Sequence, residues 1–323
     1  MADGIADLTY RRYEGELEAP HSRWKVIAAH GIRSAFKKKS LWVLTALSSW
    51  YYLIMAATFF ALQTQVNNAL QAGPGAEQAA KMANSQFDRV IWKDQFLHGF
   101  GFSNMLYMIV AIIIGSGLIA NDFRSNALLV YLSKPLSKMD YFIGKWMGMF
   151  VPMLVMIGIP HALFYVYGAL SFADRGFIKD SPWLGVQLLI AIPLTAAFYT
   201  SLTVGVSSMF RSGRLAAALL AGIYFISSFF KVLMSVAAGS DQIKGPARDF
   251  VDMGTYFSIE GAVRGMVKFM IDSDGSPPFL FSMQGQTVIP KPPLYYVILT
   301  LGLVIGLGAF VALRRIRAVE VVK

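Results

Sequence analysis

Residues 121–140 read NDFRSNALLVYLSKPLSKMD, a polar segment between two apolar runs that carry no charged residue, Gly99–Ala120 and Trp146–Leu170. The hydrocarbon core of a bilayer is about 30 Å thick and needs about 20 apolar residues in a helix, so each run is long enough to cross it. The 121–140 segment then joins two transmembrane helices on one side of the membrane. We expect it to form a membrane-parallel helix followed by a turn.

The rest of the chain has the composition of a polytopic membrane protein. Of its 323 residues, 55% are hydrophobic and 15% are charged, whereas soluble domains have about 25% charged residues. Four further runs are long enough to span a membrane, and Lys231 is their one charged residue: Leu41–Leu62, Trp183–Phe210, Leu215–Ala238 and Pro293–Leu313. None of the six runs alternates apolar and polar residues as barrel strands do. The sequence therefore predicts an all-α integral membrane fold with six transmembrane helices.

The distribution of charge predicts the orientation. We expect one domain over residues 1–323, with an N-terminal segment (1–40), a six-helix bundle (41–313) and a tail (314–323). Of the 29 Lys and Arg residues, 18 lie on the side of the termini and 10 lie in the three opposite loops. By the positive-inside rule, both termini and the 121–140 segment are cytoplasmic. This bias and contact with anionic lipids account for the net charge of +10, so we expect no nucleic-acid partner.

Two absences in the sequence narrow the expectations further. No cleavable signal pattern precedes the first span, and the chain has no cysteine. We therefore expect neither an external domain held by disulfides nor a thiolate metal site.

Residues 22–38 show the pattern of an amphipathic helix next to the first span. Its apolar residues recur at helical spacing on one face: Trp24, Ile27, Ala28, Gly31, Ile32 and Ala35. Basic residues lie on the opposite face, and a basic helix with a tryptophan on its apolar side is typical of the membrane interface. The helix is either a simple juxtamembrane anchor or an elbow that also borders a motor protein.

Two of the three opposite loops are long. The first, Gln63–His98, is broken at Gly73-Pro74-Gly75, and residues 77–96 are compatible with a helix. In the third, Ser240–Pro292, Ser258 is suited to cap a helix. The apolar face of that helix carries Ile259, Val263, Met266, Val267 and Met270, and the opposite face carries Glu260, Arg264 and Lys268. We expect this external helix to lie on the outer leaflet or to roof the bundle and close a pathway.

Residues with catalytic or ligating chemistry are few. The four histidines are scattered without metal-ligand spacing, so we predict no catalytic residue and no metal site. His161 and Lys231 are ionisable residues within spans and are candidates for a substrate pathway. The alternatives are local packing for His161 and, for Lys231, an ammonium group that extends to the outer surface.

Small residues spaced four apart favour close helix packing. They occur at Gly144–Gly148 and at Gly302–Gly306, and such pairs allow two helix backbones to approach closely. The pattern leaves open whether either pair joins two subunits or two helices of one chain.

A nucleotide-binding phosphate loop is missing from the sequence. At Gly144-Lys145, Met139 occupies the place of the first glycine of that motif, and Trp146 stands where Ser or Thr is required. If the protein is part of an ATP-driven pump, another chain hydrolyses the nucleotide.

Residues 117–145, GLIANDFRSNALLVYLSKPLSKMDYFIGK, resemble the signature of ABC-2-type transporter permeases, in particular those of the copper-maturation and gliding-motility type. In that family an acidic residue, Arg-Ser-Gly, an apolar stretch, a Ser-x-Pro turn, an aromatic residue and Gly-Lys join spans two and three. Two positions depart from the pattern, because Asn126 replaces the usual glycine and Asp122 replaces the commoner glutamate. The supporting likeness, six spans and an elaborated external segment before the last one, extends over the whole chain.

The resemblance implies a function and a set of partners. The protein would be the permease subunit of an ATP-binding-cassette exporter in the bacterial cytoplasmic membrane, paired with two ATPase subunits that hold ATP and Mg²⁺ and with a second permease. It would have no enzymatic activity or cofactor of its own. The residues implied in ATPase coupling are Asp122, Phe123, Arg124, Ser125, Leu129, Tyr131, Ser133, Lys134 and Pro135.

Two other classes of function remain open from the residues alone. One is an integral-membrane enzyme acting on lipids, with a site formed from His161, Lys231, Asp249 or Asp252. The other is a structural anchor subunit of a larger membrane complex. The substrate and the identity of the second permease do not follow from the sequence.

Overall fold

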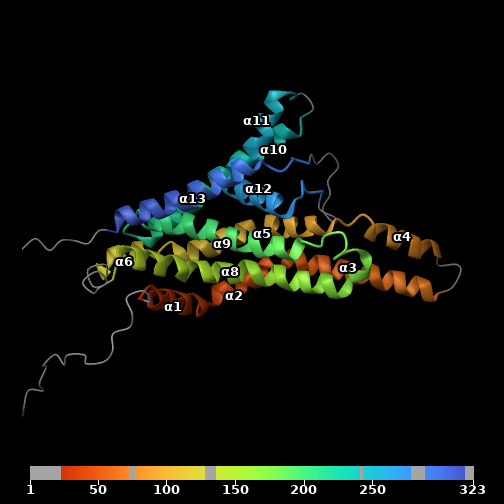
Figure 1. The fold of residues 1–323 in the computed structure, drawn as a ribbon, viewed down its shortest axis with the longest axis horizontal. Helices are drawn as coiled ribbons and strands as arrows, with labels where there is room; N and C mark the ends of the chain where they lie inside the picture. The colour runs from red at the N-terminus through yellow and green to blue at the C-terminus, as the bar shows by residue number, and fades with distance from the viewer. Residues whose placement is uncertain (1–22, 73–76, 128–135, 241–242, 278–287, 317–323) are drawn as a thin grey trace, which may run out of the picture.

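The computed structural model describes residues 23–72, 77–127, 136–240, 243–277 and 288–316 (Figure 1). Within these ranges all regular secondary structure is helical. Six helical segments are long and apolar enough to cross a membrane: Lys39–Gln71, Trp92–Arg124, Lys138–Ser171, Leu184–Ser207, Gly213–Ala238 and Leu294–Arg315. The predicted all-α fold with six spans is thereby confirmed.

The six segments run along the long axis of the molecule, so the bundle has two ends (Figure 1). One end holds α1 (Arg23–Phe36), α6 (Ala120–Arg124) and the last turns of α13 (Leu294–Arg315). The opposite end holds α4 (Glu77–Phe87). We refer to these as the α6 end and the α4 end.

The first span consists of two helices that meet at Ser49. They are α2 (Lys39–Ser48) and α3 (Trp50–Gln71), and together they cover 33 residues. At 1.5 Å per residue this is roughly 50 Å, well beyond the thickness of the hydrocarbon core. α3 therefore continues past the predicted end of the span at Leu62.

The region expected to be a long loop, 63–98, is mostly helical. The end of α3 packs against α4 to form a helical hairpin, and α5 (Trp92–Gly115) begins soon afterwards. The helix expected over 77–96 is divided in two, since α4 ends at Phe87 and the backbone is extended at Ile91, the residue before α5. Aromatic rings fill the base of the hairpin, where Trp92 lies 5.2 Å from Phe59 between ring centroids.

The third span is the longest helix of the described chain, α8 (Lys138–Ser171), with 34 residues. It begins eight residues before the predicted start at Trp146, because a capping box defines its first turn. The Ser137 hydroxyl accepts a hydrogen bond from the Asp140 N–H at 3.0 Å, and the Asp140 carboxylate accepts one from the Ser137 N–H at 3.2 Å. The helix continues through two internal prolines.

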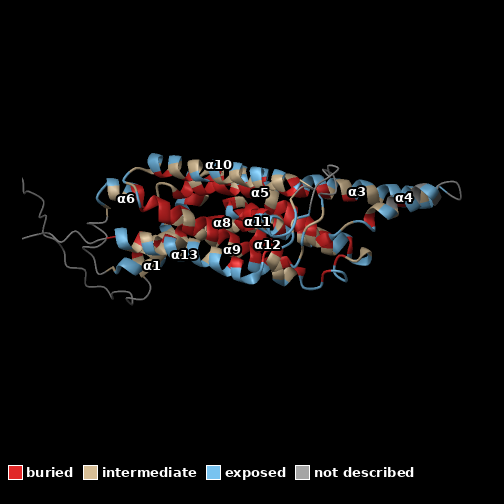
Figure 2. Ribbon diagram, turned by 90° about the horizontal axis from the view of Figure 1, so that it is seen from above, coloured by how far each residue is buried: buried red, intermediate tan, exposed pale blue. Residues whose placement is uncertain are grey.

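Burial differs sharply between the spans (Figure 2). Within an apolar stretch of each helix, 61% of the residues are buried in α9 (Leu184–Ser207), against 11% in α10 (Gly213–Ala238) and 17% in α13. α9 is therefore central and packs against α8, α5 and α13. α10 exposes large apolar side chains, among them Phe225 and Phe229. Exposed apolar faces of this size on a six-span bundle face lipid or another protein.

The described part of the chain between α10 and α13 contains two α-helices, one of which the sequence predicts. α11 (Pro246–Gly254) was missed, whereas α12 (Ile259–Ile271) lies where the periodicity predicts a helix. The Ser258 hydroxyl accepts a hydrogen bond from the Gly261 N–H at 2.8 Å, which is the predicted cap. α12 packs against α5, α9, α10 and α13.

The polar face of α12 differs from the expectation. The sequence pattern directs Glu260, Arg264 and Lys268 away from the bundle. In the structure the Glu260 carboxylate pairs with Lys231 of α10 at 2.8 Å, and Lys268 is buried with 3% exposure. The reason is that α12 lies between α10 and α5, so both of its faces meet protein.

Candidate functional site

A single serine fixes the start of the 121–140 segment to a neighbouring span. The hydroxyl of Ser207, in the last turn of α9, accepts hydrogen bonds from the N–H groups of Ile119 (3.1 Å) and Ala120 (3.2 Å). It donates to the carbonyl of Ser116 at 2.8 Å. The first N–H groups of a helix have no partner within the helix, so an external acceptor stabilises the start of α6.

Asp122 joins α6 to the start of α8. Its carboxylate accepts a hydrogen bond from the Tyr141 hydroxyl at 2.6 Å and pairs with the Lys145 ammonium at 2.6 Å. Tyr141 and Lys145 lie four residues apart and so share one face of α8. The side chains of Lys145 and Asp122 are 14% and 17% exposed. Charge-assisted hydrogen bonds of this kind are roughly twice as strong as those between neutral groups.

The remaining residues of α6 divide into a buried and an exposed side. Phe123 packs against a small core formed by the ends of several spans, including Tyr141, Val204 and Ile316. Arg124 and Ser125 are exposed. α6 is therefore anchored to the bundle through Asp122 and Phe123, whereas Arg124 is exposed on its surface.

The helix expected over 121–132 is interrupted after its first turn. α6 ends at Arg124, and Asn126 has a φ of 53°, in the left-handed region. A residue in this conformation cannot continue an α-helix, and glycine and asparagine adopt it most readily. The left-handed conformation at Asn126 is one that glycine, the residue at this place in the signature that the segment resembles, adopts without strain. The other predicted coupling residues, Leu129, Tyr131, Ser133, Lys134 and Pro135, lie outside the described residues.

Substitutions at Asn126 should separate backbone strain from side-chain chemistry. Asn126→Gly should leave thermal stability unchanged, whereas Asn126→Val should cost about 1–2 kcal/mol, because a β-branched residue clashes in the left-handed region. Thermal unfolding of the purified variants measures the difference. Equal melting temperatures for the two variants would contradict the assigned turn.

α1 packs directly on α8 beside this site. A Cβ atom added at Gly31 would lie 3.0 Å from the Cα of Gly148, so the two backbones are in contact. The pair Gly144–Gly148 therefore serves packing within the chain. At Gly302 and Gly306 an added Cβ would meet no described atom within 4 Å. The location of α1 at the membrane interface stays a prediction.

A cavity of about 720 Å³ opens next to the Asp122–Lys145 pair. Residues of α1, α5, α8 and α10 line it, and both members of the ion pair lie on its wall. The α6 end is therefore hollowed at the point where α1 and the second, third and fifth spans approach one another.

The two candidates for a substrate pathway lie in different surroundings. His161 is fully buried, its Nδ1 lies 2.7 Å from the Ile157 carbonyl, and its ring centroid lies 3.9 Å from that of Phe100. Lys231 pairs with Glu260 and is 26% exposed. The structure thus places His161 in an aromatic core and Lys231 in an interhelical ion pair.

The residues considered for a lipid-directed enzyme do not come together. Asp252 of α11 pairs with Arg248 at 3.2 Å, and Asp249 is exposed. Within the described ranges, no hydrogen bond or ion pair links His161, Lys231, Asp249 and Asp252 to one another.

Three residues that anchor α6 at the α6 end were not identified as site residues from the sequence. They are Tyr141, Lys145 and Ser207, which hold Asp122 and the start of α6. A signal for the first two was present, since the Ser137-x-x-Asp140 capping pattern fixes the start of α8 and so the face that carries Tyr141 and Lys145. Ser207 lies 87 residues from Ala120, and no local pattern connects them.

The fold and the site define a class of protein. It is an all-helical membrane protein with six spans, whose second and third spans are tied together through a polar segment. Residues 24–259 match the sequence profile of the family described as ABC-2 family transporter protein. The chain therefore belongs to the ABC-2 transporter family.

A relative from Bacillus subtilis (strain 168) also matches the chain. It is described as an uncharacterized transmembrane protein, YxlG, and is 28% identical over 131 residues, which cover 39% of this chain and 49% of that protein. The chain thus aligns with about half the length of the relative it matches. The similarity supports a membrane protein of related type.

Proposed function

We propose that the chain is the permease subunit of an ABC transporter and that a separate ATPase subunit drives it to export a substrate. Family membership supports the permease role. The observation that carries the coupling role is the link from Asp122 to Tyr141 and Lys145, with distances of 2.6 Å. This link makes the exposed α6 turn a rigid part of two spans rather than a loose connection.

The attachments of α6 supply a mechanical route for coupling. Through Ser207 it is bound to α9, and through Asp122 it is bound to α8, while its own chain continues α5. A force applied at Arg124 would therefore move the ends of the second, third and fourth spans together. Rigid-body movement of this kind is the form of transition that alternating access requires.

The assembly that we propose contains two ATPase subunits and a second permease. ATP and Mg²⁺ would bind to the ATPase subunits, because the sequence lacks a phosphate loop. The exposed apolar faces of α10 and α13 supply area for contact with a second permease or with lipid.

Copurification tests the proposed partner. A tagged full-length chain should retain a soluble subunit that contains a phosphate loop, and Asp122→Ala should lower the recovered amount because it removes the anchor of α6. Lys81→Ala, at the opposite end of the molecule, serves as the matched control. Recovery of the permease without any such subunit, under conditions where the complex is otherwise stable, would argue against the proposal.

We place the protein in the bacterial cytoplasmic membrane with both termini and the α6 end in the cytoplasm. The distribution of 18 basic residues on that side and 10 on the other supports this orientation. Figure 1 shows α1, α6 and the last turns of α13 at the same end of the bundle, as this topology requires.

Labelling of single cysteines tests the orientation, and the native chain without cysteine gives no background. Cysteines at Ser125 or Ser212 should react with membrane-permeant thiol reagents alone. A cysteine at Ser85 or Ser276 should also react with impermeant reagents once the outer compartment is open. The reverse pattern would overturn the orientation.

We further propose that α12 closes the outward end of the pathway. Its apolar face is sealed into the bundle, with Val263, Val267 and Ile271 fully buried. Its opposite face is held to α10 by Glu260 and Lys231. A helix held between spans in this way can open the outer end when those spans separate.

A further inference from the structure

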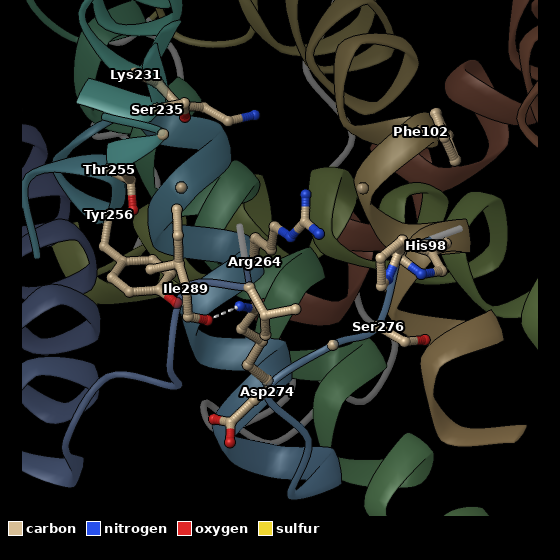
Figure 3. A pocket seen from close by; sticks show the side chains of 17 residues that line it. His98, Phe102, Lys231, Ser235, Thr255, Tyr256, Arg264, Asp274, Ser276 and Ile289 are labelled. Atoms are coloured by element: carbon tan, nitrogen blue, oxygen red, sulfur yellow. Dashed lines mark hydrogen bonds between the residues drawn. The ribbon is translucent and has the colours of Figure 1, made fainter. Parts of the chain in front are cut away.

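A second cavity, of about 530 Å³, lies toward the α4 end between α5, α10, α12 and the chain that follows α12 (Figure 3). Four basic side chains from three helices line it: His98 of α5, Lys231 of α10, and Arg264 and Lys268 of α12. Lys231 lies seven residues before the end of α10, and His98 lies six residues after the start of α5. The cavity is therefore near the outer ends of both spans.

Arg264 points into this cavity without a partner in the described part of the chain. Figure 3 shows its guanidinium between the side chains of Lys231 and His98. Burial lowers the pKa of Arg264 from its usual value, yet a guanidinium stays charged at physiological pH. No hydrogen bond or ion pair within the described ranges involves this group, so a charged fork of donors faces the cavity.

Lys268 adds a second cation near Arg264, and its side chain is buried. It is 3% exposed, and its ammonium donates a hydrogen bond to the Ile289 carbonyl. Burial, and then the nearby charge of Arg264, lower the pKa of Lys268 to about 8. The two cations thus raise each other's free energy in a site that is partly shielded from water.

The nearby carboxylates do not neutralise these two cations by direct contact. Among the residues described, each carboxylate has another partner: Glu260 the Lys231 ammonium at 2.8 Å, Asp94 the Ser276 N–H at 2.7 Å, Asp274 the Lys291 N–H at 2.7 Å, and Asp252 the Arg248 guanidinium at 3.2 Å. They lower the electrostatic cost of burying Arg264 and Lys268 from a distance. The ligand position beside the guanidinium is left to another anion.

His98 supplies an unsatisfied polar atom on the same wall. The residue is 3% exposed, and its Nε2 is buried with no hydrogen-bond partner among the described residues. A buried polar atom without a partner costs about 1–3 kcal/mol. In the tautomer that carries its proton on Nε2, the ring would donate that proton to a ligand oxygen.

We propose that this cavity binds the phosphate group of an anionic membrane amphiphile, with Arg264 as its main contact and Lys268 and His98 beside it. A guanidinium fork matches the geometry of a phosphate and forms paired, charge-assisted hydrogen bonds. The volume lies within the range of about 300–1,000 Å³ that is usual for ligand sites.

The surface next to the cavity is what favours an amphiphile. Ser235 and Gly239 follow Lys231 at intervals of four residues and line the cavity with it. The adjacent stripe of α10 exposes Val232 and Val236, which are 55% and 70% exposed. An apolar chain that leaves the cavity would therefore lie along a membrane-facing apolar surface, while its phosphate stays with Arg264.

Binding to the purified full-length chain tests this site without any ATPase, so its outcome is independent of the proposed transport function. Short-chain phosphatidylglycerol is titrated into protein in a neutral maltoside detergent. Short-chain phosphatidylcholine, whose choline group the cations repel, and inorganic phosphate are titrated in parallel. Phosphatidylglycerol should bind about tenfold or more tightly than either, because phosphatidylcholine carries the repelled choline group and inorganic phosphate lacks the acyl chains that would pack along α10.

Variants assign the binding to the proposed residues. Arg264→Gln and Lys268→Gln should each weaken phosphatidylglycerol binding by about tenfold or more, and Arg264→Lys should fall between Arg264→Gln and the native chain. Lys81→Gln removes a cation from the same side of the molecule, on α4, and should change nothing. Melting temperatures of the variants verify that they are folded, and Arg264→Lys replaces Arg264→Gln if the latter does not fold.

Three results would overturn the proposal. The first is equal affinity for phosphatidylglycerol and phosphatidylcholine, and the second is native affinity in a folded Arg264 variant. The third is inorganic phosphate binding as tightly as phosphatidylglycerol, which would rule out a membrane amphiphile as the ligand.

Discussion

Reversing the charge of Arg124 should lower ATP hydrolysis stimulated by the permease by about tenfold or more, while insertion and abundance stay normal. Arg124 is exposed on a turn whose neighbours Asp122 and Phe123 are anchored in the bundle. An arginine held on a rigid support is typical of the few residues that dominate a protein interface. Arg124→Glu leaves the anchors intact, so the loss would report on docking rather than on folding. ATPase assays of the reconstituted complex measure it.

Arg315→Glu provides a matched control at the same end of the molecule, because Arg315 is also exposed but ends α13. It should leave stimulation near the native level. Leu129→Asp, outside the described residues, is the apolar counterpart of the test and should also uncouple the complex. Native complex formation and activity in both Arg124→Glu and Leu129→Asp would refute the docking assignment.

Neutralising Glu260 should release α12 from α10 and make ATPase activity less dependent on substrate. Glu260 pairs with Lys231 and accepts a hydrogen bond from Tyr224, and Lys231 lowers its pKa against the opposing effect of burial. The pair is partly buried, at 26% and 20% exposure. Glu260→Gln should therefore destabilise the fold by about 1–3 kcal/mol, between the values for exposed and buried pairs.

A charge swap distinguishes the ion pair from a simple packing effect. Lys231→Glu combined with Glu260→Lys should recover stability and ATPase control that each single reversal loses. Asp249→Asn, on the exposed side of α11, is the matched control. If the double variant loses as much stability and ATPase control as the two single reversals together, Lys231 and Glu260 do not act as a pair. Val267→Glu is a poorer probe of the same closure, because Val267 is fully buried and a charge there would unfold the core.

The spans could be predicted because membrane solvation leaves few alternatives. A run such as Gly99–Ala120 must be a helix to satisfy its backbone in hydrocarbon. The cap at Ser258 and the periodicity after it also gave α12 within one residue of its observed start. These signals are local and can be recognised without knowing the rest of the fold.

What the sequence could not provide were partners that lie far apart in the chain. α11 carries a mixed sequence, PARDFVDMG, that does not stand out from a loop. The spacing Gly144–Gly148 indicated close packing, but not that α1 would be the neighbour. The sequence suggests that Lys231 extends outward or faces a cavity, but it does not show that its carboxylate partner lies on α12, 29 residues away. Such pairings depend on tertiary geometry, which periodicity does not encode.

The helical hairpin of α3 and α4 has a practical consequence for imaging. The protein has a mass of 35.6 kDa, and most of it would be surrounded by detergent or lipid, which obscures small particles in electron cryomicroscopy. α4 stands beyond the bundle as a short rod with exposed side chains such as Lys81 and Ser85 (Figure 1). A nanobody raised against this rod would add an asymmetric mark for particle alignment, far from Arg124.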